Sequence, residues 1–99
     1  MAEAGFALRW REAAFADLED IFEFVAQDNP IAAAKLASSI HNQAERLRLN
    51  PRLGRPGRLA GVRELVVPRL PYIVAYQVRG RRIEILAVVH TSRLWPTGF

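Results

Sequence analysis

Five consecutive apolar residues, Ile85–Val89, constrain the fold of this chain more than any other feature. A strand with one wet face alternates apolar and polar residues, so an unbroken apolar run indicates cover on both faces. Two runs precede it, Val62–Val67 and Tyr72–Val78, and both are rich in the β-branched and aromatic residues that favour strands. We therefore expect three consecutive antiparallel strands, with the last, Arg82–His90, at the centre of the sheet.

Proline and glycine mark the connections between these strands. Pro68 and Pro71 lack the backbone N–H that a ladder requires, so the segment between them is predicted to be a loop. Gly80 lies between two arginines and suits a tight turn with a positive φ. After His90 the chain changes abruptly to the polar and aromatic segment HTSRLWP. A buried strand that delivers such residues to a sheet edge indicates a functional site there.

The first half of the chain predicts one short strand and two amphipathic helices. Phe6–Trp10 has strand composition and follows a leader, residues 1–5, that we expect to be flexible. Apolar residues recur at helical spacing over Glu12–Gln27 and over residues 30–49. Asn29 is a candidate N-cap for the second helix, and the proline after it suits the first helical position.

These elements predict an α+β fold in the order β-α-α-β-β-β. A helix hairpin would pack on one side of a mainly antiparallel four-stranded sheet, and residues 1–99 would form a single domain. Between the second helix and the strands, residues 50–61 contain two prolines and three glycines, which predicts a loop. Its arginines, Arg52, Arg55 and Arg58, make it a flexible basic strip in this interpretation.

Charge divides the chain into an acidic and a basic half. Residues 1–45 carry eight acidic and three basic residues, and residues 46–99 carry two acidic and eleven basic ones, so the halves have net charges of −5 and +9. The arginine fork binds phosphate and carboxylate groups with two parallel hydrogen bonds. The basic half is therefore either a solvated surface or a docking surface for an anionic partner.

Composition excludes several classes of site. The chain has no cysteine, so it has neither disulfides nor thiolate metal ligands. Its two histidines, His41 and His90, lie in different elements, and we expect no metal site and no cofactor. No apolar run approaches the roughly 18 residues of a membrane-spanning helix, and the first residues lack the features of a signal peptide. We expect a cytoplasmic protein without a membrane partner.

The order of these motifs resembles the ParE/RelE superfamily of toxins from type II toxin–antitoxin systems. The resemblance covers residues 6–96 and rests on ADLEDIFEFV and NPIAAAKLASSI, then VREL, PYIVAYQV and IEILAVVHTSRLWP. It implies a hetero-oligomer with a ParD-like antitoxin that carries a ribbon-helix-helix DNA-binding domain. The antitoxin would wrap the toxin with a C-terminal segment, commonly a helix in a groove.

The superfamily has branches with different targets. RelE-like members resemble ribosome-dependent mRNA endonucleases, which need a base, an acid and a cation around the scissile phosphate. Their middle strand carries an Arg-x-x-Tyr pattern; here Tyr76 matches the tyrosine, but Ile73 occupies the arginine position. The PY…Y strand and the VVH-x-x-R ending are more similar to the ParE branch. The resemblance to ParE implies a toxin that poisons DNA gyrase by binding to it. The prediction is a gyrase inhibitor, with an endonuclease as the alternative.

Each interpretation selects its own residues. For a gyrase inhibitor no catalytic residue is expected, and the target-binding residues are His90, Arg93, Trp95, Arg52, Arg55 and Arg58. The predicted antitoxin-binding residues are Leu18, Ile21, Phe24, Arg63, Arg69, Arg81 and Arg82. For an endonuclease the candidates are His90, Arg93, Arg69 and Arg63.

Structural roles remain open for several of these residues. His90 could simply end its strand, Arg93 could stack on Trp95, and Phe24 could pack under the leader or Phe99. A third interpretation, a non-toxic module that binds nucleic acid, would show strongly salt-dependent binding by the isolated chain.

Overall fold

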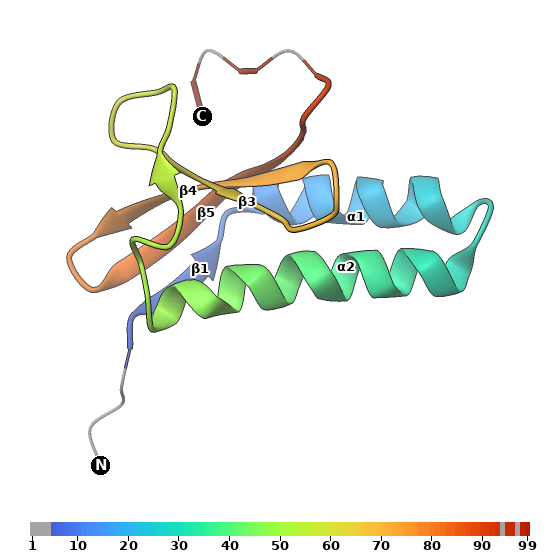
Figure 1. The fold of residues 1–99 in the computed structure, drawn as a ribbon, viewed down its shortest axis with the longest axis horizontal. Coiled ribbons are helices and arrows are strands. Elements are labelled where there is room, and N and C mark those ends of the chain that lie inside the picture. The colour runs from blue at the N-terminus through green and yellow to red at the C-terminus, as the bar shows by residue number, and fades with distance from the viewer. Residues whose placement is uncertain (1–4, 94, 97) are drawn as a thin grey trace.

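Strand β5 lies inside a five-stranded sheet of order β1-β5-β4-β3-β2 (Figure 1). The computed structural model describes residues 5–93, 95–96 and 98–99. The strands are β1 (Ala7–Trp10), β2 (Arg55–Pro56), β3 (Arg63–Val66), β4 (Tyr72–Arg79) and β5 (Arg82–His90). β1 runs parallel to β5, and the other neighbouring pairs are antiparallel. The three-stranded meander predicted from the sequence is confirmed and β5 has the predicted bounds, but the middle strand of the sheet is β4 and not β5.

Two helices form an antiparallel hairpin on one side of this sheet (Figure 1). They are α1 (Glu12–Ala26) and α2 (Pro30–Glu45), and a 3₁₀ turn, η1 (Arg46–Arg48), follows α2. Asn29 caps α2 as predicted: its Oδ1 accepts a hydrogen bond from the Ala32 N–H at 3.0 Å. Neither helix in the described part of the chain is long and apolar enough to cross a membrane.

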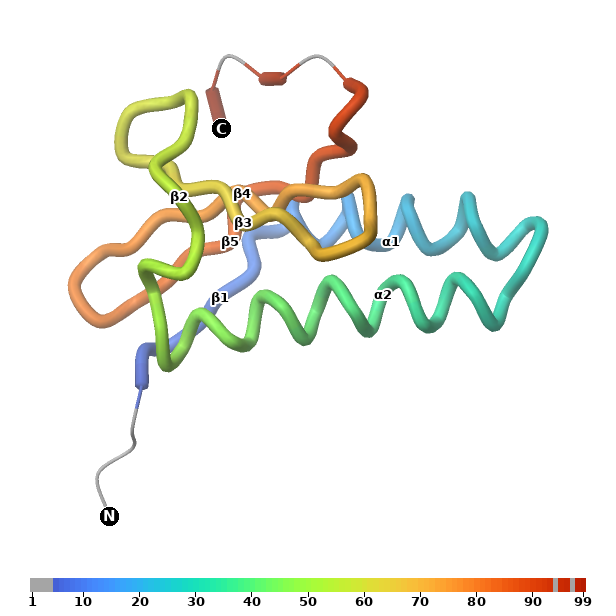
Figure 2. Tube along the Cα trace, in the orientation of Figure 1, coloured from blue at the N-terminus to red at the C-terminus, as the bar shows by residue number. Residues whose placement is uncertain are grey.

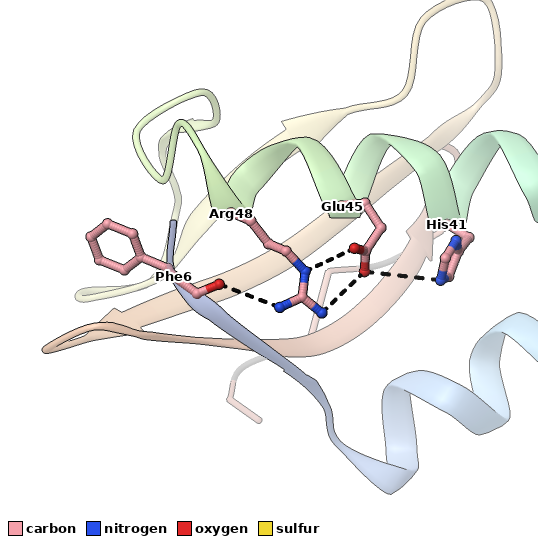
Figure 3. A network of polar contacts seen from close by, with 4 residues as sticks. All are labelled: Phe6, His41, Glu45 and Arg48. Carbon is pink, nitrogen blue, oxygen red and sulfur yellow. Dashed lines mark hydrogen bonds and ion pairs between the residues drawn. The ribbon is translucent and has the colours of Figure 1, made fainter. Parts of the chain in front are cut away.

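The end of α2 is bonded to the start of β1 (Figure 3). The Arg48 guanidinium donates to the Glu45 carboxylate at 2.8 Å and to the Phe6 carbonyl at 3.3 Å, and the Arg48 carbonyl accepts the Phe6 N–H at 2.8 Å. His41 lies 4.0 Å from the same carboxylate. These contacts fasten the residue before β1 to the turn that ends the helix hairpin. The predicted leader, residues 1–5, lies outside the described residues except for Gly5.

Both faces of β5 are covered, as the apolar run predicted. The face toward the helices belongs to the main core, whose largest buried members are Tyr76, Ile40, Leu47, Ile83, Ile85 and Val74. On the other face Ala75, Ala87 and Val89 pack with Val62 and Trp95. The second cover therefore comes from the residues that precede β3 and follow β5, and neither helix of the described residues contributes to it.

A β-bulge in β5 sets which residues face each cover. Ala75 pairs with Ala87, but the next residue of β4, Tyr76, pairs with Ile85, so Leu86 is the extra residue. The bulge shifts the in-out alternation by one position. Ile85 and Val88 can then both face the helix hairpin while Ala87 faces Trp95.

The sequence prediction of four strands is one strand short. Arg55 pairs with Glu64 and Pro56 with Arg63, so two residues of the predicted loop form the edge strand β2. A two-residue strand that contains a proline has no periodicity for sequence reasoning to detect. Proline is tolerated there because an edge strand needs ladder donors on one side only.

A buried charge at Ile40 tests the packing of the hairpin on the sheet. Ile40 is fully buried, so Ile40→Asp would place a carboxylate in an apolar interior. We expect a loss of about 4 kcal/mol or more in the free energy of unfolding, enough to remove most of the folded population. Ser39→Asp, at the exposed neighbouring position, is the matched control and should stay near the wild type. Thermal scans by circular dichroism measure both, and an unchanged midpoint for Ile40→Asp would contradict this packing.

Candidate functional site

A groove of about 520 Å³ lies between α1 and the C-terminal end of β5. We call it the α1 groove; its lining residues are Asp17, Asp20, Ile21, Phe24, Tyr72, Val88, His90, Ser92 and Arg93. Ile21 and Phe24 were predicted for the antitoxin, and His90 and Arg93 for the target. The structure thus brings two residues from each of two separately predicted sets into one groove.

The apolar part of the α1 groove is open to solvent. Phe24 has 74% of its surface exposed, so it does not pack under Phe99; the leader, the other segment considered for it, lies outside the described residues except for Gly5. The Phe99 ring instead meets Trp95 edge-on, with 6.4 Å between ring centroids. Ile21 is half-buried beside Phe24, whereas Leu18 packs against the main core and does not line the groove. An exposed aromatic ring next to a partly buried aliphatic one is typical of a partner-binding surface.

His90 is held in one orientation at the end of β5. Its Nδ1 accepts the Ser92 N–H at 3.0 Å and lies 2.7 Å from the Ser92 hydroxyl, which leaves the proton of the neutral ring on Nε2. The ring meets Tyr72 edge-on, with 5.2 Å between centroids. Nε2 therefore serves as a hydrogen-bond donor at the mouth of the groove.

Asp17 completes the sheet edge inside the groove. β1 pairs with β5 only as far as Ile85, so on that side of β5 no described strand pairs with Val88. The Asp17 carboxylate accepts the Val88 N–H at 3.0 Å in place of a strand carbonyl. Burial raises the pKa of this carboxyl; nearby Asp20 adds to the effect, and the hydrogen bond and Arg93 oppose it. Sequence reasoning missed this role because an acidic residue near a helix start also suits the helix dipole.

Residues 50–62, which comprise the predicted loop 50–61 and Val62 before β3, are fastened to the sheet, contrary to the prediction of a flexible strip; we call this segment the arginine loop. The Tyr76 hydroxyl accepts the Gly54 N–H at 2.9 Å and donates to the Pro51 carbonyl at 2.7 Å. Gly54 lies directly on the Tyr76 ring, where a Cβ would come within 2.7 Å of two ring-end atoms. Composition predicted the loop correctly but not its anchoring, because the anchor is more than 20 residues away in the chain.

Glu64 holds the same loop from β3. Only 2% of its surface is exposed. Its carboxylate accepts the Arg58 N–H at 2.9 Å and lies 3.5 Å from the Arg55 guanidinium and 3.6 Å from that of Arg58. The Arg58 guanidinium also lies over the Trp95 ring, 4.1 Å from its centroid (the C-terminal segment is traced in Figure 2). Arg58, rather than Arg93, is thus the arginine on Trp95.

The remaining predicted arginines are spread over the surface. Arg63 donates to the Gly54 carbonyl at 2.6 Å, so its guanidinium holds the loop. Arg69 is exposed in the β3–β4 turn with φ of 65°, at the His90 end of the meander. Arg81 and Arg82 are exposed at the opposite end of β4 and β5, and Arg81 lies 4.6 Å from the centroid of the Phe6 ring.

A second hollow, of about 610 Å³, is separate from the α1 groove. It lies between the loop and the β4–β5 turn, and its lining includes Phe6, Leu59, Val62 and Val78 with Arg52 among them. Within the described ranges, no group of three or more His, Cys, Asp or Glu side chains is placed to hold a metal ion.

Known proteins are similar to this chain in sequence and in fold. Residues 8–95 match the family model described as the ParE toxin of the type II toxin-antitoxin system, parDE. "Putative toxin Y4kP" of Sinorhizobium fredii is 38% identical over 89 residues, which cover 90% of this chain and 92% of that protein. "Toxin RelE2" of Caulobacter vibrioides is 35% identical over 85 residues, covering 86% and 94%.

Two solved complexes show the same arrangement of elements. A chain of the chromosomal ParDE system from P. aeruginosa superposes with a TM-score of 0.81 and 30% identity, covering 91% of this chain and all of that one. A chain of the RelBE2 toxin–antitoxin complex from Mycobacterium tuberculosis gives a TM-score of 0.60 and 21% identity, covering 90% and 94%. The second likeness concerns the fold alone.

The raised pKa of Asp17 predicts a pH dependence of stability. The folded chain binds this proton more tightly than the unfolded chain, so the free energy of unfolding falls as pH rises from the ordinary value of 3.8 through the raised pKa. Asp17→Asn keeps an oxygen for the Val88 N–H but removes the titration. We therefore expect the variant to gain stability relative to the wild type across this window and to keep the gain above it. Urea unfolding between about pH 3 and about pH 7 measures the difference, and a constant difference would contradict the role of burial.

Proposed function

Because this chain belongs to the ParE toxin family of type II toxin–antitoxin systems, we propose that it arrests growth by binding DNA gyrase in the cytoplasm and that a ParD-like antitoxin neutralises it. The observation that carries the proposal is the α1 groove. One solvent-open groove with both apolar and polar lining holds predicted antitoxin-binding residues, Ile21 and Phe24, beside predicted target-binding residues, His90 and Arg93. An antitoxin helix seated there would cover His90 and Arg93 and so prevent target binding.

The arrangement around His90 supports binding rather than RNA cleavage. A metal-independent ribonuclease needs a cation beside the scissile phosphate. Ile73, which stands where RelE-like toxins have an arginine, is buried in β4. Arg63, one of the predicted substitutes, donates to loop carbonyls through its guanidinium. Arg93 is the one predicted catalytic arginine that shares the groove with His90 in the described structure.

The target is tested with purified protein in two parallel assays. We expect the chain to inhibit DNA supercoiling by gyrase and to accumulate cleaved DNA, and to leave mRNA on programmed ribosomes intact. In cells, induction should produce filaments before protein synthesis falls. Ribosome-dependent mRNA cleavage that is lost in His90→Ala, with gyrase unaffected, would replace the proposal with the endonuclease alternative suggested by the relative named RelE2.

The antitoxin site is tested at Phe24. Truncation of an exposed aromatic anchor typically costs about 1–3 kcal/mol of binding free energy, so Phe24→Ala should raise the dissociation rate roughly 5- to 150-fold. Phe15→Ala is the matched control, because Phe15 is on the same helix and 55% exposed but does not line the groove. Surface-immobilised kinetics with the purified antitoxin measures both. Equal dissociation rates for Phe24→Ala and the wild type would exclude the groove as the antitoxin site.

A further inference from the structure

We propose that Glu64 is a positioning residue that holds the arginine loop and Trp95 together as one target-binding surface. The inference rests on the proposed function, because it assigns those two segments to the target. Sequence patterns selected Arg52, Arg55 and Arg58 separately from Trp95, some 40 residues later in the chain. In the structure a single buried carboxylate connects them.

Glu64 lies on the face of the sheet opposite the helices. It pairs across strands with Ala75, which belongs to the small apolar cluster that Val62 and Trp95 cover. A carboxylate in such a place is costly unless charge and hydrogen bonds compensate it. The contacts that compensate Glu64 come from Arg55 and from both the N–H and the guanidinium of Arg58.

All these donors belong to the loop, so the loop cannot move away without leaving a buried charge unpaired. The loop also approaches Glu64 very closely at Gly57, where a Cβ would lie 2.8 Å from a Glu64 carboxylate oxygen and 2.7 Å from the Val62 carbonyl. A bulkier residue at position 57 would therefore separate the loop from its anchor. The loop conformation and the pairing of the Glu64 carboxylate depend on each other.

Arg58 connects Glu64 to the C-terminal segment. Its backbone N–H binds Glu64, and its guanidinium lies between that carboxylate and the Trp95 ring. A guanidinium over an indole face is attracted by the ring quadrupole and shields the ring from water. Trp95 in turn covers Ala87 and Val89 of β5. Glu64 thus determines where two predicted target-binding segments meet without contacting the target itself.

The first test asks whether Glu64 positions the loop, independently of any target. Glu64→Gln keeps the size of the side chain and removes its charge. Glu84→Gln is the matched control. Like Glu64, Glu84 accepts a hydrogen bond from an arginine, here Arg11, and it accepts another from Gln77, but it is not bonded to the loop. In the full-length chain, trypsin should cleave after Arg52 and Arg58 several-fold faster in Glu64→Gln than in the wild type or the control. The bond after Arg55 is resistant to trypsin, because Pro56 follows it.

Fluorescence reports on Trp95 in the same variants. In a Trp10→Phe background Trp95 is the only indole, because the chain has two tryptophans. Glu64→Gln should increase its quenching by acrylamide, and Glu84→Gln should not. Wild-type cleavage rates together with unchanged quenching in Glu64→Gln would overturn the positioning role. If Glu64→Gln fails to fold, Arg58→Met carries the test, because it removes only the guanidinium and should still increase the quenching of Trp95.

Gyrase inhibition then distinguishes failure of this inference from failure of the proposed function. We expect Glu64→Gln and Arg58→Met each to weaken gyrase inhibition about tenfold or more. Because both substitutions break the same contact, the double variant should inhibit gyrase as well as the less active of the two single variants. Inhibition at the wild-type level by a Glu64→Gln protein whose loop is released would overturn the inference. A wild-type chain that leaves gyrase unaffected would instead overturn the proposed function, and the proteolysis result would still decide whether Glu64 holds the loop.

Discussion

The two-sided burial of β5 is the constraint on which the rest of the structure depends. A small α+β domain commonly covers one face of its sheet with helices and leaves the other to solvent. Here Ala87 and Val89 make the second face apolar as well, and no further helix lies in the described residues to cover it. The loop of residues 50–62 and the segment after β5 do so instead. The segments predicted to bind a target are therefore also structural parts of the core.

The sequence was sufficient for every helix and strand except the two-residue β2, and insufficient for their attachments. The apolar run and its flanking glycine predicted β5 to the residue, and Asn29 with the following proline predicted the start of α2. The anchoring of the loop was not predictable, because Tyr76 and Glu64 are unremarkable residues within strands. Their roles depend on which loop atoms come within 3 Å of them. Chain proximity also suggested Trp95 as the partner of Arg93, whereas the fold brings Arg58 to it.

The candidate site was predictable only in part, because the sequence indicated its residues but not their neighbours in space. Helical spacing placed Phe24 off the buried stripe, and the abrupt end of β5 placed His90 at a sheet edge. The sequence did not predict that Phe24 and His90 share a groove, because this depends on how α1 lies along β5. The arginines were the least predictable group. Their abundance indicated an anionic partner, but Arg55, Arg58 and Arg63 bind acceptors within the chain.

Native-state hydrogen exchange tests most directly whether the sheet, the loop and the C-terminal segment form one cooperative unit around β5. The informative amides are those of Gly54 and Arg58, which bond to Tyr76 and Glu64, and those of Ile85 and Val88 in β5. If these segments form one cooperative unit, all four amides should exchange only through global unfolding, and with its free energy. Loop amides that exchange through local openings of much lower free energy, while β5 stays protected, would contradict this account.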